Sequence, residues 1–121
     1  MRPNRFTMVL CLVVVLLCCA VGAGGETLYP VSVGTLIAAH TADIHSSWGK
    51  LEVNPLLRSI DGRFRIKGVA IKSGIVMGNL TGQTLILRRW PKARKIATLV
   101  NFISVGVVGG VAIRNYTVRK K

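Results

Sequence analysis

Long uncharged segments alternate with short basic ones along this chain. An apolar run covers residues 8–21, and three later segments, 28–48, 69–87 and 96–113, are apolar enough to predict helices. At a rise of about 1.5 Å per residue these three segments are about 27 to 32 Å long, which is enough to cross the hydrocarbon core of a bilayer. The pattern therefore predicts an all-α fold, an integral membrane three-helix bundle.

The segments between the predicted helices are short and basic. Residues 49–68 and 88–95 link the helices, and residues 114–121 form a basic tail. The whole chain has 17 Lys and Arg against 4 Asp and Glu, a net charge of +13. Cations clumped between apolar segments are typical of membrane topology, whereas a nucleic-acid-binding protein spreads them over a soluble face. We therefore expect no nucleic-acid partner, and we expect these loops to bind anionic lipid head groups.

Residues 1–23 have the pattern of a secretory signal peptide. Arg2 and Arg5 precede the apolar core, and Val21 and Ala23 stand at the spacing that a signal peptidase reads. An uncleaved fourth helix is the alternative. More Lys and Arg lie on the side of the basic tail than on the opposite side, so we expect a multi-pass protein of a bacterial cytoplasmic (inner) membrane with a cytoplasmic C-terminus.

Each predicted span carries small residues at four-residue spacing, which places them on one face of a helix. Lipid gives apolar helices no reason to associate, so membrane helices use such residues to bring their backbones close together. We expect three small-residue faces to pack the bundle: Gly34, Ala38, Ala42 and Ser46 on the first span, Gly74, Gly78 and Gly82 on the second, and Gly106 and Gly110 on the third.

Polar residues also fall on common faces of the spans. Six of them are expected to pair the helices: His40, Asp43, Lys72, Asn79, Gln83 and Asn101. Asp43 and Lys72 lie about 5 to 8 Å from the same end of their helices, so we predict that they form an ion pair, since an unpaired charge there costs several kcal/mol. Counting residues from the helix ends in the same way places Gln83 and Asn101 at the same depth in the membrane, where they could form a hydrogen bond.

The histidines and the acid in this first span do not predict an enzyme or a metal site. On a continuous helix His45 is turned about 140° from His40, so too few ligands converge to hold a metal. Ser47, His40 and Asp43 share a face, but on one helix their side chains run parallel and cannot form a catalytic relay. We expect no enzymatic activity, no metal and no cofactor. Ligation of a pigment by His40 or His45 stays open.

The stretch "ADIHSSWGKLEVNPLL", residues 42–57, ends the first span and turns the chain. Glycine can end a helix, and the residue before a proline is disfavoured in helical geometry. The stretch resembles a motif of an uncharacterised family of small bacterial multi-span membrane proteins, whose positions are here Asp43, Ser46 or Ser47, Gly49, Glu52, Asn54 and Pro55. The resemblance implies a membrane bundle in which the Asp and the turn matter together, and it implies no activity. If Glu52 bends back to His45 or Lys72, the turn locks the first two helices together.

These features predict a small structural or accessory membrane protein. Its expected partners are anionic lipid and other membrane helices. These helices would belong to further copies of this chain or to other membrane proteins. The alternative is a proton- or ion-coupled transport element with Asp43, His40 and Lys72 on its path. That alternative requires an oligomer, because three helices seldom enclose a pathway.

Overall fold

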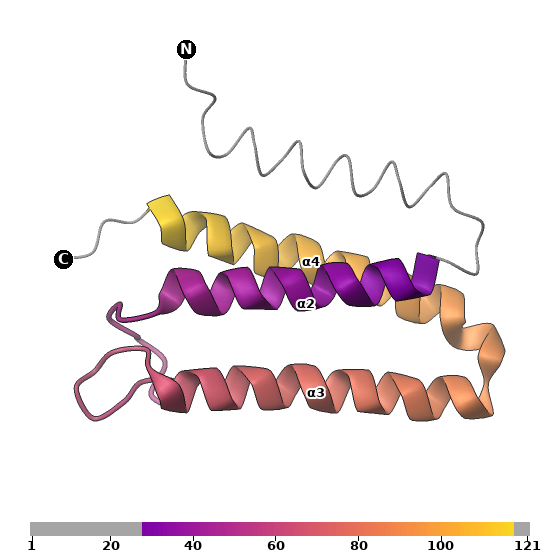
Figure 1. Ribbon diagram of the computed structural model, residues 1–121, viewed down its shortest axis with the longest axis horizontal. Helices are drawn as coiled ribbons and strands as arrows, with labels where there is room; N and C mark the ends of the chain where they lie inside the picture. Colours follow the sequence, from indigo (N-terminus) through magenta and orange to yellow (C-terminus); the bar gives the residue numbers. More distant parts are fainter. Residues whose placement is uncertain (1–27, 118–121) are drawn as a thin grey trace, which may run out of the picture.

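The computed structural model describes residues 28–117, and in this part of the chain three α-helices and one short 3-10 helix form an all-α fold (Figure 1). The elements are α2 (Leu28–Ser47), α3 (Ile66–Arg89), η1 (Pro91–Ala93) and α4 (Arg94–Thr117). α3 runs antiparallel to α2 and α4, and α2 packs closely along α4 but approaches α3 at fewer positions. The predicted signal peptide, residues 1–23, lies outside the described residues.

Two of the three helices extend beyond the predicted spans. α3 starts three residues before the predicted 69–87 and ends two residues after it, and α4 extends past 96–113 at both ends, whereas α2 ends at Ser47. The apolar pattern marks only the part that could lie in hydrocarbon, and Lys and Arg are good helix formers that continue a helix beyond it. The predicted loop 88–95 therefore shrinks to Trp90 and η1, where Pro91 occupies the first helical position.

The connection between α2 and α3, residues 48–65, is a loop fixed by backbone hydrogen bonds. Gly49 follows the end of α2 with φ of 72°, and Gly62 turns the chain with φ of 74°, both in the left-handed region that suits glycine. The Gly49 amide donates to Phe64 O at 2.9 Å, and the Phe64 amide donates to Lys50 O at 2.9 Å. Arg63 adds a side-chain bond from Nη1 to Gly49 O at 2.7 Å, so both ends of the loop are tied together.

One segment of the described residues, Pro91–Thr117, is long and apolar enough to cross a membrane. Only 17% of its most apolar window is buried, whereas a core helix of a soluble protein is mostly buried. The other two predicted spans fall below this hydropathy, because polar residues such as His40, Asp43 and Lys72 interrupt them. The three-span bundle thus stays a prediction.

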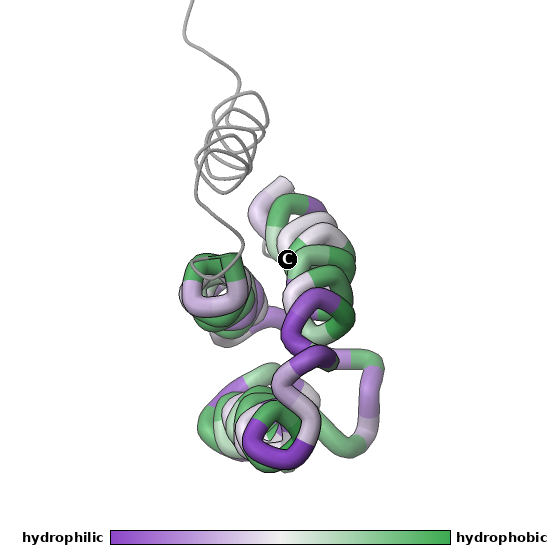
Figure 2. Tube along the Cα trace, turned by 90° about the vertical axis from the view of Figure 1, so that its right-hand side faces the viewer, coloured by the Kyte–Doolittle hydropathy of each residue, from purple (hydrophilic) through white to green (hydrophobic). Residues whose placement is uncertain are grey.

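About half of the buried residues of the bundle are polar, and many of its large apolar side chains are exposed. The buried polar residues are Ser32, Asp43, Ser46, Ser47, Gln83 and Asn101, and the buried apolar residues are Leu36, Phe64, Val76, Val105 and Ala112. Large aliphatic side chains such as Ile75, Met77, Ile103 and Val107 are exposed instead. Figure 2, viewed along the helices, shows hydrophobic residues over much of the outer side of the helices.

The prediction that small residues pack these three helices together is wrong for glycine. A Cβ added at any of six glycines, Gly34, Gly74, Gly78, Gly82, Gly106 and Gly110, would have no neighbouring atom within 4 Å. Ala38 is also exposed and Ala42 is half-buried, and Ser46 alone of the predicted ridge is buried. The reason is that each helix has one face to turn inward. The polar face takes that position, so the glycine face is left outside.

Gly68, in the first turn of α3, is the described glycine whose surroundings leave no room for a side chain. A Cβ there would lie 2.8 Å from Leu57 O and closer still to the Phe64 ring. We expect Gly68→Ala to lower the free energy of unfolding by about 1–3 kcal/mol, because the loop must shift to relieve the overlap.

Gly74→Ala on the same helix is the matched control for Gly68→Ala. It meets no atom within 4 Å and should stabilise α3 by up to about 1 kcal/mol through helix propensity. Denaturant titration in detergent micelles, followed by circular dichroism, measures both. Equal stability of the two variants would contradict the described packing of the loop on α3.

Candidate functional site

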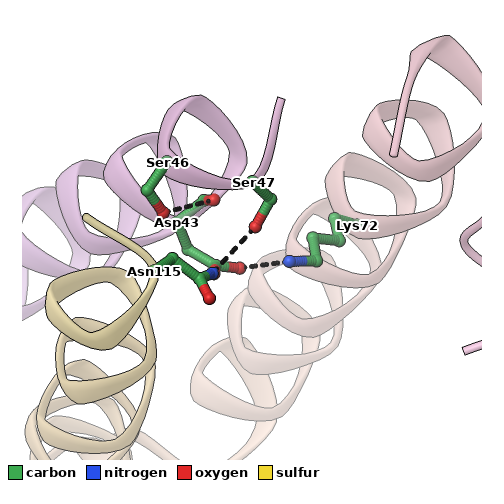
Figure 3. A network of polar contacts seen from close by, with 5 residues as sticks. All are labelled: Asp43, Ser46, Ser47, Lys72 and Asn115. Carbon is green, nitrogen blue, oxygen red and sulfur yellow. Dashed lines mark hydrogen bonds and ion pairs between the residues drawn. The ribbon is translucent and has the colours of Figure 1, made fainter. Parts of the chain in front are cut away.

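The Asp43 carboxylate lies where side chains of all three α-helices meet (Figure 3). Lys72 of α3 forms an ion pair with its Oδ2, and Asn115 of α4 donates from Nδ2 to its Oδ1 at 3.5 Å. Asn115 also donates to Ser47 Oγ at 3.0 Å, and Ser46 Oγ donates to Asp43 O at 2.9 Å. These five residues form the charged cluster, which ties α2 to both other helices.

The ion pair is largely removed from solvent. The side chains of Lys72 and Asp43 are 17% and 7% exposed, and the Lys72 ammonium also lies 4.9 Å from the centroid of the Phe64 ring. Phe64 itself is fully buried beside the first turn of α3, where it contributes a cation–π contact. Either charge alone would be costly at this position, so each depends on the other.

A second group of polar side chains connects the helices closer to their other end. Gln83 of α3 donates from Nε2 to Asn101 Oδ1 at 2.7 Å, and Asn101 of α4 donates from Nδ2 to Ser32 Oγ at 3.0 Å and to Gln83 Oε1 at 3.2 Å. The Tyr29 hydroxyl of α2 donates to Gln83 Oε1 at 3.2 Å. These four residues form the amide cluster, in which Asn101 and Ser32 are fully buried.

The two clusters are separated by apolar side chains. Ser32 and Asp43 are eleven positions apart on α2, which corresponds to about 16 Å along the helix axis. The buried residues Leu36, Val76 and Val105 lie between these levels on their helices. The interface therefore has polar contacts near both ends and apolar ones in the middle, so α3 is held to the other helices at two separate levels.

The structure brings together two pairs of residues that the depth count predicts to be in contact. Asp43 meets Lys72, and Gln83 meets Asn101. Asn79 does not pair helices as predicted: it is exposed, and its Oδ1 accepts a bond at 3.2 Å from Gln83 Nε2 of the same helix, α3.

His40 does not pair helices as predicted. Its Nδ1 is shielded from solvent and has no hydrogen-bond partner among the described residues. It stands three positions before Asp43 and is therefore rotated by about 60° around α2. Across residues 28–117 no group of three or more His, Cys, Asp and Glu is placed to hold a metal ion.

The turn motif acts locally, and Glu52 does not bend back to His45 or Lys72. Glu52 Oε1 accepts a bond from the Asn54 amide at 3.0 Å, and Asn54 Oδ1 accepts one from the Leu56 amide at 3.0 Å. Such side-chain bonds to amides two residues ahead are typical of turns. His45, one of the predicted targets of Glu52, bonds through Nδ1 with the Tyr116 hydroxyl at 2.8 Å instead.

Two residues of the clusters, Tyr29 and Asn115, were not predicted from the sequence, whereas the spacing of Ser32 and Asp43 places both on the polar face of the first span. Asn115 follows Asn101 by fourteen positions, close to four helical turns, which places both on one face of α4. That spacing could have identified Asn115, but only if the last helix is continued past residue 113.

The buried ion pair gives a test by double-mutant cycle. Asp43→Leu leaves Lys72 without its partner and should lower the free energy of unfolding by about 3–5 kcal/mol, and Lys72→Met should act similarly on Asp43. The double variant Asp43→Leu, Lys72→Met should recover most of that loss, because no charge is left unpaired. Unfolding in mixed micelles measures all four proteins, and strictly additive losses would contradict the pairing.

Comparison with protein-family models, with curated proteins and with solved structures finds no match for this chain. The resemblance of residues 42–57 to small bacterial membrane proteins accordingly stays a prediction.

Proposed function

We propose that this protein is a multi-pass membrane protein in which α2, α3 and α4 all cross the bilayer, and that it serves as a structural or accessory subunit without enzymatic activity. The carrying observation is an arrangement inverted relative to a soluble bundle: polar side chains make up about half of the buried residues, while many large aliphatic side chains are exposed. In water apolar burial drives folding, so a soluble bundle has the opposite arrangement. In hydrocarbon a polar group must find its partner within the protein, which both polar clusters do.

The inverted arrangement also supports a membrane position for α2 and α3, whose average composition is less apolar than that of α4. The residues that lower their hydropathy include Ser32, Asp43 and Gln83, and these are buried. The surfaces that α2 and α3 would turn to lipid are thus more apolar than the average over all residues of these helices. Exposed apolar area of this extent is uncommon on soluble monomers.

The outward glycine faces support binding of further membrane helices. Gly74, Gly78 and Gly82 are spaced at one turn along α3, and a Cβ at any of them would meet no atom within 4 Å. Without side chains at these positions, the backbone of another helix can approach closely, as it does in membrane helix pairs. The partner would be a second copy of this chain or a different membrane protein.

The turn between α3 and α4 supports binding of anionic lipid. Five exposed cations surround Trp90 there: Arg88, Arg89, Lys92, Arg94 and Lys95. None of their side chains has an ion-pair or hydrogen-bond partner in the part of the chain that the structure describes. Each cation near an anionic membrane surface contributes about 1 kcal/mol. We further propose that the C-terminus lies on the cytoplasmic side of the membrane, as the sequence predicts.

A second candidate function is proton- or ion-coupled transport by an oligomer. The observation in its favour is the unpartnered Nδ1 of His40, one turn from Asp43 and shielded from solvent. Against it, both oxygens of the Asp43 carboxylate already have donors, Lys72 on one and Asn115 on the other.

Transport is tested by proton flux into vesicles that contain the reconstituted protein. Under the structural proposal, the wild type and Asp43→Asn should both show only the leak of empty vesicles. A flux that the wild type supports and Asp43→Asn abolishes would establish transport instead.

The structural proposal is tested on the glycine face of α3. Gly78→Ile should weaken association with other membrane helices by about tenfold or more, because the side chain blocks backbone approach. The stability of the isolated chain should stay within about 0.5 kcal/mol, since the position is exposed. Association is measured by resonance energy transfer between labelled copies, and by quantifying co-purified membrane proteins after mild-detergent extraction.

Met77→Ile is the matched control, because it places the same side chain at a neighbouring exposed position about 100° away around α3. It should leave association unchanged. A wild-type chain that is monomeric and carries neither lipid nor protein after mild extraction would overturn the proposal.

A further inference from the structure

The loop between α2 and α3 exposes large apolar side chains at positions where turns are normally polar. Val53, in the turn after Glu52, is 92% exposed, and Ile60, in the next turn, is fully exposed. Leu51 and Leu56 are also exposed, as is Trp48 at the end of α2. Turn tips usually carry Gly, Pro, Asn, Asp or Ser, whose backbone and side-chain geometry suits a turn, and a cluster of exposed apolar side chains marks an interaction surface. Exposed aliphatic side chains in two consecutive turns indicate that this loop contacts an apolar environment.

The loop presents these side chains from a defined backbone. The turn at Val53 is closed by the bond from the Asn54 amide to Glu52 Oε1, and the turn at Ile60 by the bond from the Gly62 amide to Ser59 O at 2.9 Å. Two isolated antiparallel bridges, Leu51 with Arg63 and Arg58 with Phe64, join the two sides of the loop. The exposure of Val53 and Ile60 is therefore a feature of the fold.

Cations lie between the apolar side chains of this loop and at the start of α3. Arg58 and Lys67 are exposed, and Arg65 pairs with Asp61 at 2.6 Å. Desolvation raises the pKa of the Asp61 carboxyl, but bonds from the Arg63 amide and the Arg65 side chain outweigh it and hold this pKa below its ordinary value. Asp61 is thus ionised and offsets Arg65, which leaves Arg58 and Lys67 as exposed positive charges.

We propose that residues 48–65 form an interfacial loop, with Val53 and Ile60 inserted at the boundary between head groups and acyl chains and with Arg58 and Lys67 on anionic head groups. This proposal rests on the membrane position of the bundle proposed above. Apolar residues alternating with cations, beside a tryptophan at a helix end, are the composition of segments that lie in a membrane interface.

Continuity with the lipid-facing surface favours the bilayer over a soluble partner as the occupant. α3 begins with the exposed Ile66 directly after the loop, between the exposed cations Arg65 and Lys67, so the mixture of apolar and cationic side chains continues from the loop onto the start of the helix. A soluble protein bound to the loop would not cover the helix surface beyond it. A bilayer covers both.

Depth-dependent fluorescence quenching tests the proposal on the full chain. In a background with Cys11→Ala, Cys18→Ala and Cys19→Ala, single cysteines replace Val53, Ile60 or Ile103 and carry an environment-sensitive fluorophore. The proteins are reconstituted in phosphatidylcholine–phosphatidylglycerol vesicles with spin-labelled lipids whose quencher is shallow or deep. Ile103 is exposed near the middle of α4 and reports whether the bundle is embedded.

The expected result separates the two depths. Labels at Val53→Cys and Ile60→Cys should be quenched about twofold or more strongly by the shallow lipid than by the deep one, whereas Ile103→Cys should show the reverse order. Loop labels quenched by aqueous iodide but by neither lipid, with Ile103→Cys still quenched by the deep lipid, would overturn the interfacial loop alone. An Ile103→Cys label that the deep lipid does not quench would instead overturn the membrane position of the bundle.

Discussion

The ion pair between Asp43 and Lys72 determines which faces of α2 and α3 are turned toward each other. A charge without a partner in a low-dielectric surrounding is costly, so the faces that carry these two residues must meet. Asn115 binds the same carboxylate and thereby orients α4 as well. With these polar faces inside, most of the glycine positions of the helices lie outside, together with large apolar side chains.

The amide cluster adds a second fixed point to this arrangement. One contact between two helices leaves them free to rotate about it, whereas two contacts about 16 Å apart set both the rotation and the axial register of each helix. This matters most for α3, which approaches α2 at few positions. Gln83 and Lys72, on the same side of α3, are the residues that hold it, and the buried Val76 lies between them.

The sequence predicts the helices and the two central contacts because both depend on position along a single helix. Hydropathy locates the apolar segments, and counting residues from their ends places Asp43 level with Lys72 and Gln83 level with Asn101. What it cannot decide is a competition between faces. The glycine face and the polar face of α3 both favour contact with another helix. The polar face turns inward because an unpaired charge costs more than close backbone packing gains. The sequence also leaves open where the Glu52 side chain turns, and the nearby Asn54 amide binds it in place of any distant partner.

The same reasoning bears on whether Asp43 is a structural or a proton-carrying residue. A carboxylate that transfers protons must exchange partners during each cycle, so its contacts have to be separable from those that keep the protein folded. Asp43 does not meet this condition, because its two oxygens hold Lys72 of α3 and Asn115 of α4 at once. Protonation would weaken the contact to Lys72 and with it one of the two points that fix α3. The arrangement therefore favours the structural function proposed for Asp43, in which its contacts to Lys72 and Asn115 persist and the helices stay together.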